Sequence, residues 1–349
     1  MILEALSNAV GISGREDAVR KIILEAINGH AENIRIDAMG SITAVKKGTG
    51  ENLPRVMVAA HMDEIGFMVT GFDGNGLIRF TSVGGVDARI LPGLRVRLGD
   101  DLIPGVIIWT PIHHNRSQSV KGISDLRIDI GATKKEAASG KVSRGDRITF
   151  DSKFMEIGET MMRGKAFDDR VGCSLLVDIL QGGPYPVDVL AAFTTQEEVG
   201  LRGAKVAAQH FDPDVAFVLE GTTAHDLPNP QADADDETDI NPTARVGDGP
   251  VLSAMDSSMI TDPRLFKFLK QTAEANDIPY QIKSRRGGGT DAGSIHLAKA
   301  GTSSAVISAP CRYIHSPAAM MSKNDYAAML NLAQAALNAI TFDTLAREN

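Results

Sequence analysis

Continuous apolar runs alternate with amphipathic segments toward both ends of the chain. Apolar runs without regular polar positions predict strands that are buried on both faces of a sheet, and they lie at residues 55–61, 187–195, 214–220 and 303–309. Segments with apolar positions three and four residues apart predict helices at residues 168–181, 201–211, 263–276, 291–300 and 322–340. This alternation predicts an α/β fold with helices on both faces of the sheet.

The start of the chain predicts a helix, a loop, a second helix and two strands. Ser13 precedes the amphipathic run DAVRKIILEAI, and Glu16 follows three residues later, which is the spacing of a capping box for the second helix. Residues 33–38 and 41–48 are predicted to be the two strands. Near the other end, Ser322 with Asp325 three residues later gives a similar signal for the last helix.

From about residue 66 to residue 157 the pattern changes to short β-like runs that are spaced by Gly, Asp and Pro. Only residues 133–139 suggest a helix in this stretch. Short strands at such spacing predict a small barrel or sandwich. The simplest organisation is one α/β domain made of residues 1–65 plus 158–349, with a β domain of residues 66–157 inserted into it.

Composition and charge narrow the functional classes. The chain has 349 residues, of which 43% are hydrophobic and 23% charged, as in globular proteins, and its formal net charge is −8. An acidic protein is a poor candidate for general binding to nucleic acid or to an anionic membrane. No window approaches the ~18 apolar residues of a membrane span. The N-terminus lacks the basic region of a secretory signal.

The two cysteines, Cys173 and Cys311, lie among apolar or small residues. Two thiols in a chain of this length do not form a disulfide framework. We predict that both are buried thiols of a reducing compartment, and therefore a cytoplasmic protein. The acidic, proline-containing stretch of residues 225–243 is predicted to be a loop.

Residues that can bind metals gather at or just after the predicted strand ends, where ligands collect in open α/β sheets. His61 and Asp63 are two residues apart, so they point to the same side of an extended chain, and the carboxylate can orient the imidazole. A strand-end histidine satisfied by a turn is the alternative. Asp168 precedes a predicted helix, where a helix cap is the alternative to a metal ligand.

Further carboxylates and a histidine follow the other strands. Glu197 and Glu198 are adjacent, so their side chains diverge, and one could bind metal while the other faces water or substrate. A solvated strand end is the alternative for this pair. Glu220 ends an apolar strand, where a carboxylate needs a cation or hydrogen-bond donors. His315 follows the strand at residues 303–309 and carries little information alone.

Taken together, these side chains can supply three ligands to each of two metal ions, with one carboxylate shared. The set consists of His61, Asp168, Glu198, Glu220 and His315. A mixture of imidazoles and carboxylates suits Zn or Co, and also Mn, better than Mg. Two metals ~3.5–4 Å apart can generate hydroxide at neutral pH and polarise a carbonyl. The sequence therefore predicts two divalent metal ions per subunit.

Six motifs occur in order along essentially the whole chain: AAHMDEIGFMV (59–69), GKAFDDRVGC (164–173), TTQEEVGLRGA (194–204), LEGTTAHD (219–226), GGGTDAG (287–293) and RYIHSP (312–317). As a set they resemble the tetrahedral-aminopeptidase family of dinuclear metallopeptidases, which includes glutamyl aminopeptidases and proteins labelled endoglucanase M. The resemblance implies a Zn-peptidase-like mixed sheet flanked by helices, with an inserted small β-barrel domain for dimerisation. It also implies homo-oligomers, in which dimers often assemble into a hollow dodecamer.

The resemblance also assigns the metal ligands. It makes Asp168 the bridging carboxylate, His61 and Glu220 the remaining ligands of one metal, and Glu198 and His315 those of the other. Glu220 departs from the family pattern, in which aspartate is frequent at this position. One extra methylene can change how the carboxylate binds or shift the metal, so the departure bears on metal preference.

Other positions receive roles outside the ligand set. Glu197 matches the general base, and Asp63 matches the aspartate that tunes the histidine ligand. The His113–Asn115 segment belongs to the inserted domain and is not counted as a ligand group. The Gly-rich residues 287–293 lack the Lys-Ser/Thr of a phosphate-binding loop, so they are either a substrate-side loop or a flexible turn before a helix.

The resulting hypothesis is a metalloaminopeptidase that hydrolyses N-terminal residues from peptides with a free N-terminus. Glu197 would take a proton from a metal-bridging water and pass it to the leaving amine. One alternative is a deacylase that acts on small amides at the same site. Another is a metal-independent glycoside hydrolase that uses a carboxylate pair. A metal-binding or peptide-binding module without turnover is the third.

Overall fold

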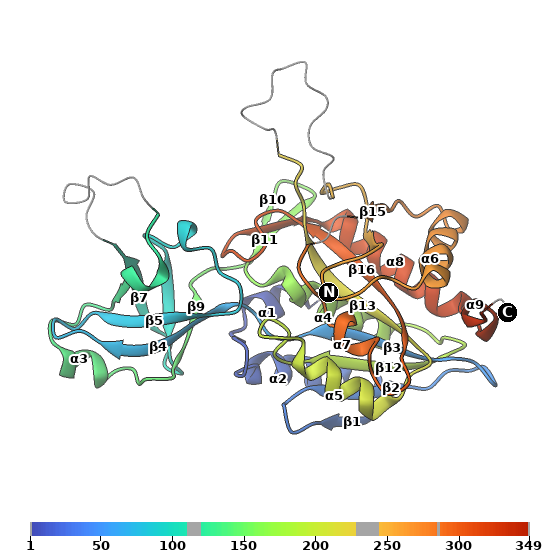
Figure 1. Ribbon diagram of the computed structural model, residues 1–349, viewed down its shortest axis with the longest axis horizontal. Helices are drawn as coiled ribbons and strands as arrows, with labels where there is room; N and C mark the ends of the chain where they lie inside the picture. The colour runs from blue at the N-terminus through green and yellow to red at the C-terminus, as the bar shows by residue number, and fades with distance from the viewer. Residues whose placement is uncertain (1, 110–119, 228–243, 285–286, 348–349) are drawn as a thin grey trace, which may run out of the picture.

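The computed structural model describes residues 2–109, 120–227, 244–284 and 287–347 (Figure 1). The His113–Asn115 segment and residues 228–243 of the predicted acidic loop lie outside the described residues. In the described ranges, no helix combines the length and the apolar character that crossing a bilayer requires. The chain forms a large mixed sheet flanked by helices and a closed barrel of short strands.

The larger part of the molecule is built on a mixed sheet, which has eight strands within the described residues. Their spatial order is β1 (Glu32–Ile36), β2 (Ile42–Lys46), β12 (Asp188–Thr194), β3 (Arg55–His61), β13 (Val215–Thr223), β16 (Ser303–Cys311), β14 (Val251–Ser253) and β15 (Gln281–Lys283). The four central strands β12, β3, β13 and β16 are parallel. Their carboxyl ends therefore meet at one edge of the sheet, where the following residues come together.

The central strands are almost entirely buried because their sequences place apolar residues on both faces. Successive side chains of β3 alternate between two cores: Val56 and Val58 belong to one, and Met57 and Ala59 to the other. The first core is completed by α1 (Leu3–Asn8), α2 (Asp17–Ile27), α4 (Phe167–Gln181), α6 (Pro263–Ala275) and α8 (Lys323–Ala339). The second is completed by α5 (Arg202–Phe211) and α7 (Ala292–Ile295), and α9 (Phe342–Leu345) lies against α6.

The strands that follow β3 close into a barrel, which has six strands in the described part of the chain. Their order is β4 (Gly66–Phe72), β5 (Ile78–Val83), β8 (Arg127–Asp129), β7 (Ile103–Ile108), β6 (Arg95–Leu98) and β9 (Arg147–Phe150). The barrel has its own core, in which Phe67 meets Phe80 and Phe150 edge to face at centroid distances of 5.2 and 5.4 Å. Helix α3 (Lys135–Ser139) and the short 3₁₀ helices Ala88–Ile90 and Ile123–Asp125 connect its strands. The barrel extends to one side of the sheet (Figure 1).

A small antiparallel sheet follows the barrel. It consists of β10 (Met155–Ile157), β11 (Met161–Gly164) and β17 (Ala319–Ser322). Because β17 comes from the C-terminal segment, this sheet joins the chain that leaves the barrel to the segment that carries His315. The strands of the barrel lie between residues 66 and 150. The predicted domain boundaries at residues 66 and 157 stay a prediction.

The predicted fold class is confirmed, and the inserted β region is a barrel rather than a sandwich. The predicted cap of the second helix is wrong. Helix α2 begins at Asp17, and the Ser13 hydroxyl instead donates to Asp63 Oδ2 at 2.6 Å. The cap of the last helix is confirmed, because Ser322 Oγ accepts the Asn324 N–H at 3.1 Å. The helix predicted at residues 291–300 is shorter and covers only α7.

Candidate metal centre and substrate cavity

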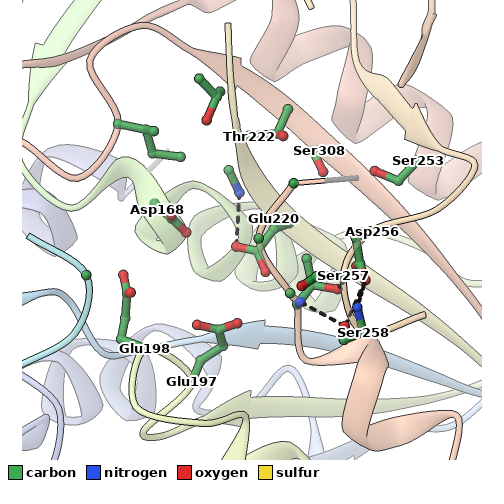
Figure 2. Close-up of a pocket in the computed structure, with 18 of the residues that line it drawn as sticks. Asp168, Glu197, Glu198, Glu220, Thr222, Ser253, Asp256, Ser257, Ser258 and Ser308 are labelled. Atoms are coloured by element: carbon green, nitrogen blue, oxygen red, sulfur yellow. Dashed lines mark hydrogen bonds between the residues drawn. The ribbon is translucent and has the colours of Figure 1, made fainter. Parts of the chain in front are cut away.

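The predicted site residues meet at the carboxyl edge of the central strands. His61 is the last residue of β3 and pairs with Thr194, the last residue of β12, so Glu197 and Glu198 follow directly beside it. Glu220 lies in β13, opposite Ser308 of β16. Figure 2 shows the side chains of Asp168, Glu197, Glu198 and Glu220 gathered on one side of a cavity.

Asp168 lies between the two histidines. Its Oδ1 is 3.1 Å from His61 Nε2, and its Oδ2 is 3.1 Å from His315 Nε2. Asp168 sits at the start of α4 with non-helical backbone angles, and the Asp168–Asp169 peptide bond is cis. Burial raises the pKa of Asp168, but the hydrogen bonds to both imidazoles outweigh burial and hold the pKa well below its usual range. The carboxylate thus connects two clusters of potential ligands.

Each histidine contacts a second carboxylate. His61 Nε2 is 3.4 Å from Glu220 Oε1, and His315 Nε2 is 3.4 Å from Glu198 Oε1. The second nitrogen of each imidazole, Nδ1, fixes the orientation of the ring. His61 Nδ1 lies 3.1 Å from the Asp63 carbonyl oxygen, and His315 Nδ1 lies 2.9 Å from the Gly85 carbonyl oxygen. The five side chains that the sequence predicted as ligands therefore converge on one place.

Asp63 supports both the histidine and the glutamate pair. Its carboxylate is fully buried, and Oδ1 lies 3.4 Å from His61 Nδ1. The same carboxylate accepts the backbone N–H of Glu197 at 2.9 Å and that of Glu198 at 3.2 Å. Ser13 donates its hydroxyl to it as well. Burial raises the pKa of Asp63, but these donors and His61 lower it overall, so Asp63 is an anion that positions its neighbours.

Glu197 faces the cavity beside this cluster. Its Oε2 lies 3.9 Å from His61 Nε2, and its side chain is 10% exposed. Burial raises the pKa of Glu197 well above its usual range, and the charges of nearby carboxylates such as Glu220 add to this effect. A carboxylate that lines the cavity in this way is placed to accept a proton from a water held there.

The donor set of this cluster fits divalent cations. Two imidazoles and three carboxylates share a small buried volume, where unpaired negative charge is costly. Glu198 Oε1 is buried and has no hydrogen-bond donor among the described residues. Burial and the charge of Asp168 raise the pKa of Glu198 to about 8, and burial likewise raises that of Glu220. Cations bound at this cluster would balance the buried negative charge and would give the unpaired oxygen of Glu198 a partner.

Two groups of close ligand atoms occur in the part of the chain that the structure describes. Within each group, one ligand atom per residue lies within 4.8 Å of the others. One group is His61, Asp168 and Glu198, and the other is His61, Asp169 and Glu220. This grouping crosses the division expected from the resemblance, so the assignment of ligands to individual metals stays a prediction.

Sequence reasoning overlooked Asp169. Its Oδ1 accepts the Gly172 N–H at 2.9 Å, and its Oδ2 accepts the His61 N–H at 3.1 Å, so it ties the end of β3 to α4. Asp168 and Asp169 are adjacent residues of the same type. The sequence therefore held no signal for which carboxylate faces the histidines and which faces the backbone.

A buried ion pair behind the site was also overlooked. Glu64 accepts hydrogen bonds from Lys165 at 2.7 and 2.8 Å, from Arg170 at 3.4 Å and from the Gly11 N–H at 2.9 Å. Arg170 is fully buried and also donates to the carbonyl oxygen of Met62 at 2.8 Å. Glu64 lies in the motif HMDE, and Lys165 and Arg170 lie in the motif GKAFDDR. Three charged residues next to candidate ligands were the signal in the sequence that could have revealed this ion pair. They fix the strand end that carries His61.

The cluster of candidate ligands opens into a cavity of about 600 Å³. The Gly-rich segment predicted as either a substrate-side loop or a turn lines this cavity through Gly287–Thr290. Asp291 of the same segment points elsewhere and accepts a hydrogen bond from the Thr194 hydroxyl. A cavity of this size can hold one or two amino-acid residues of a peptide beside the carboxylates.

Comparison with protein families gives one match over most of the chain. A family model described as M42 glutamyl aminopeptidase matches residues 40–332. A putative aminopeptidase from Acetivibrio thermocellus is 37% identical, over 93% of this chain and 94% of its own length. A glutamyl aminopeptidase from Lactococcus lactis is 33% identical, over 93% of this chain and 91% of its own. A lysyl aminopeptidase from Pyrococcus furiosus is 31% identical, over 96% of each chain.

Solved structures agree with the sequence matches. An aminopeptidase from Desulfurococcus kamchatkensis superposes with a TM-score of 0.92 at 35% identity, over 99% of this chain and 95% of its own. A Pyrococcus horikoshii TET1 peptidase, described as able to assemble into a tetrahedron or a large octahedral shell, gives a TM-score of 0.84 at 33% identity. The superposition covers 97% of this chain and 98% of that one.

Proposed function

The chain belongs to the M42 glutamyl aminopeptidase family, and from this premise we propose how its cavity carries out metal-dependent aminopeptidase chemistry. Both the predicted family and the predicted activity, hydrolysis of peptide bonds by a metalloaminopeptidase, are confirmed by these relatives. The deacylase, glycoside hydrolase and non-enzymatic alternatives are not needed.

One observation carries the proposal for the metal site: Asp168 places one oxygen against each of two histidines. A carboxylate in this position can bridge two cations. We assign the ligands as His61, Asp168 and Glu220 on one side, and as Asp168, Glu198 and His315 on the other. Mixed imidazole and carboxylate ligands favour Zn or Co, with Mn also suited. Glu220 is a carboxylate, like the aspartate that is frequent at this position in the family, but its side chain is longer. Metal titration would measure the effect of this difference on metal preference.

Glu197 is the general base of the proposed mechanism. Divalent cations held by these ligands would lower the pKa of water and polarise the scissile carbonyl. Glu197 accepts the proton of the attacking water at a carboxylate oxygen and then donates it to the nitrogen of the leaving amine. Asp63 holds the backbone N–H groups of Glu197 and Glu198 and so keeps the base aimed at the cavity. The excess of carboxylates also attracts the free α-ammonium of a peptide, which favours removal of N-terminal residues.

Metal removal tests this proposal directly. We expect that dialysis against a strong chelator abolishes hydrolysis of aminoacyl anilides, and that added Zn, Co or Mn restores it. A parallel assay compares a peptide that has a free N-terminus with the same peptide after N-acetylation. Activity that survives full metal removal would refute a metal-dependent site. Faster cleavage of the acetylated substrate would support a deacylase instead.

Assembly and location complete the proposal. We infer that residues 66–157 form a dimerisation domain and that the dimers assemble into a dodecamer, since the similar TET1 peptidase forms a tetrahedron or a larger shell. Cys173 and Cys311 are both buried free thiols. Free thiols of this kind are usual in a reducing compartment, which supports a cytoplasmic location.

A further inference from the structure

The two histidines of the candidate metal centre are held in different ways. The side chain of His61 is 2% exposed, and its Nδ1 contacts the carbonyl oxygen of Asp63, two residues farther along the same segment. The side chain of His315 is 36% exposed and belongs to the loop between β16 and β17. Its Nδ1 contacts the carbonyl oxygen of Gly85, which is 230 residues away in the sequence. His315 therefore takes its orientation from a distant element.

That element is a loop of the barrel. Gly85 lies between β5 and the 3₁₀ helix Ala88–Ile90, in the inserted part of the chain. The barrel extends to one side of the large sheet (Figure 1), but this loop contacts a candidate ligand. Gly85 also lines the cavity together with His315. A backbone group of the barrel is thus part of the surroundings of the candidate metal centre.

The contact with Gly85 determines which nitrogen of His315 can bind a cation. A carbonyl oxygen only accepts hydrogen bonds, so Nδ1 carries the hydrogen. In the neutral ring the lone pair is then on Nε2, which lies 3.1 Å from Asp168 Oδ2 and 3.4 Å from Glu198 Oε1. An Nδ1–H held by a carbonyl oxygen orients a metal-binding imidazole and raises its basicity. Gly85 therefore prepares Nε2 of His315 for a cation.

The neighbouring Gly84 lies against the second proposed ligand of this side. A Cβ at Gly84 would lie 3.3 Å from the Cβ of Glu198 and 2.8 Å from Cγ2 of Ile65. The backbone of Gly84 is left-handed, with a φ of +81°, which glycine adopts without strain. A side chain at this position would strain the backbone and push the loop away from Glu198. The two glycines let the barrel loop approach both ligands closely.

We propose that the barrel loop that contains Gly84 and Gly85 is a positioning element of the metal centre. It holds His315 and Glu198 in place for the cation that these two residues bind together with Asp168. The inference rests on the proposed metal site and assigns the barrel a part in it.

The other cation should not depend on the barrel in this way. Its proposed ligands are His61, Asp168 and Glu220, and the ring of His61 is oriented by Asp63 beside it. Asp169 accepts the backbone N–H of His61 and so ties this ligand to α4. Displacement of the barrel loop should therefore weaken the binding of one cation and spare the other.

Metal titration of Gly84→Ala tests the inference. The whole chain is freed of metal by dialysis against a chelator and titrated with Zn²⁺, while calorimetry and elemental analysis record the affinity and the number of bound ions. The wild type should bind two ions per chain. Gly84→Ala should bind one of them roughly 10- to 100-fold more weakly, which is the usual cost of losing the support of a ligating histidine. It should bind the other within about threefold of the wild type.

A second variant acts on the imidazole directly. A Cβ at Gly85 would lie 3.4 Å from His315 Nδ1 and 3.6 Å from Cε1 of the same ring. The methyl groups of Gly85→Val should therefore press on the ring and weaken the same ion as Gly84→Ala. This variant decides the question if Gly84→Ala does not fold.

The matched control is Gly131→Ala. Gly131 has a similar φ of +76° in another loop of the barrel, and a Cβ there would meet nothing within 4 Å. This variant should bind both ions like the wild type. It separates the effect of a strained barrel loop from the effect of losing contact with the ligands.

A double variant distinguishes positioning from a general loosening of the fold. His315→Ala should weaken one binding step, which identifies the ion on that side. Addition of Gly84→Ala to His315→Ala should cause no further loss, because the ring that the loop positions is already absent. A general loosening would add to the loss.

Three results would overturn the inference. They are unchanged affinities in both Gly84→Ala and Gly85→Val, equal weakening of both ions, and additive losses in the double variant. If the wild type itself binds fewer than two ions, the proposed metal site fails, and the inference fails with it.

Discussion

Asp63 connects the histidine and the two glutamates of the proposed site. It contacts the ring of His61 on one side and the backbone of both glutamates on the other. One buried carboxylate thus sets the direction of a proposed ligand and of the proposed base together. Ser13, from the N-terminal segment, adds the remaining hydrogen bond.

Replacement of Glu197 tests its proposed role as the general base. Glu197→Gln keeps the shape of the side chain but removes its ability to accept a proton. We expect kcat/KM to fall by about 10²–10⁴ or more. Metal content should stay the same, since the proposed ligand Glu198 is intact. Anilide kinetics together with elemental analysis of the dialysed protein measure both quantities.

The matched control for this variant is Glu159→Gln, an exposed glutamate on the turn between β10 and β11. It should retain the wild-type rate. A Glu197→Gln enzyme with a near-normal rate would remove Glu197 from the mechanism. Loss of metal in the same variant would mean that Glu197 acts as a ligand.

Much of the site at this scale was predictable, because each candidate ligand stands at or near the end of an apolar strand or at the start of a helix. The sequence did not reveal the residues that hold the candidate ligands in position. Asp169 cannot be told from Asp168 by residue type, and Ser13 resembled a helix cap because a serine three residues before a glutamate fits that pattern too. Both outcomes depend on contacts between residues distant in the sequence, which spacing does not record.

At the scale of elements, α6 offers a capping interaction that can be measured. Asp262 Oδ1 accepts the Arg264 N–H at 3.0 Å, and Oδ2 accepts the Ser303 hydroxyl at 2.7 Å. Burial raises the pKa of Asp262, but the hydrogen bonds from Arg264 and Ser303 outweigh burial and lower the pKa to about 2. The cap therefore links the start of α6 to β16.

This cap predicts a pH-dependent contribution to stability. The folded-state pKa of about 2 lies below the ordinary value of 3.8, so the stabilisation is complete above about pH 5 and is lost as the pH falls toward 2. Asn caps a helix as well as Asp does, so Asp262→Asn removes mainly the charge that Arg264 and Ser303 stabilise, and it should reduce the free energy of unfolding by about 1 kcal/mol at neutral pH. The difference from the wild type should shrink between pH 5 and pH 3, as thermal unfolding at each pH would show.

An exposed aspartate serves as the control for the cap. Asp101→Asn, in the turn before β7, should leave the unfolding temperature close to that of the wild type at every pH. A difference between Asp262→Asn and the wild type that stays constant from pH 7 to pH 3 would contradict the assigned role of the carboxylate.

The hydrophobic pattern predicted the type of nearly every element but not how the inserted strands close, and only the family resemblance implied a barrel. A barrel and a sandwich share the same run of short strands. The decision lies in the pairing of β9 with both β4 and β6, which joins residues 67–68 to residues 147–148 and residues 96–98 to residues 148–150. Pairings across some 50 to 80 residues leave no local pattern, so periodicity alone could not decide between a barrel and a sandwich.

At the scale of the molecule, the proposed chemistry and the proposed assembly are carried by different parts. The candidate ligands and the base all come from one chain and lie on the large sheet and its loops. The barrel extends away from them and exposes large apolar side chains in its described residues: Ile90, Leu102, Val106 and Trp109, each about 40% exposed, and Val120, which is 63% exposed. The large sheet and its helices expose apolar side chains as well, among them Ile260 and Leu297, so assembly through the barrel stays a proposal that the following experiment tests.

A dodecamer of 37.2 kDa chains has a mass of about 450 kDa, which light scattering distinguishes from smaller species. We expect the wild type near this mass. Val106→Asp, on β7, should reduce it, because a charge in an apolar contact is costly to bury. Ile36→Asp, at an exposed apolar position on β1, should leave it unchanged. The proposed ligands and base all come from one chain, so dissociated Val106→Asp should still cleave small anilides. A monomeric wild type, or equal dissociation by Ile36→Asp, would contradict assembly through the barrel.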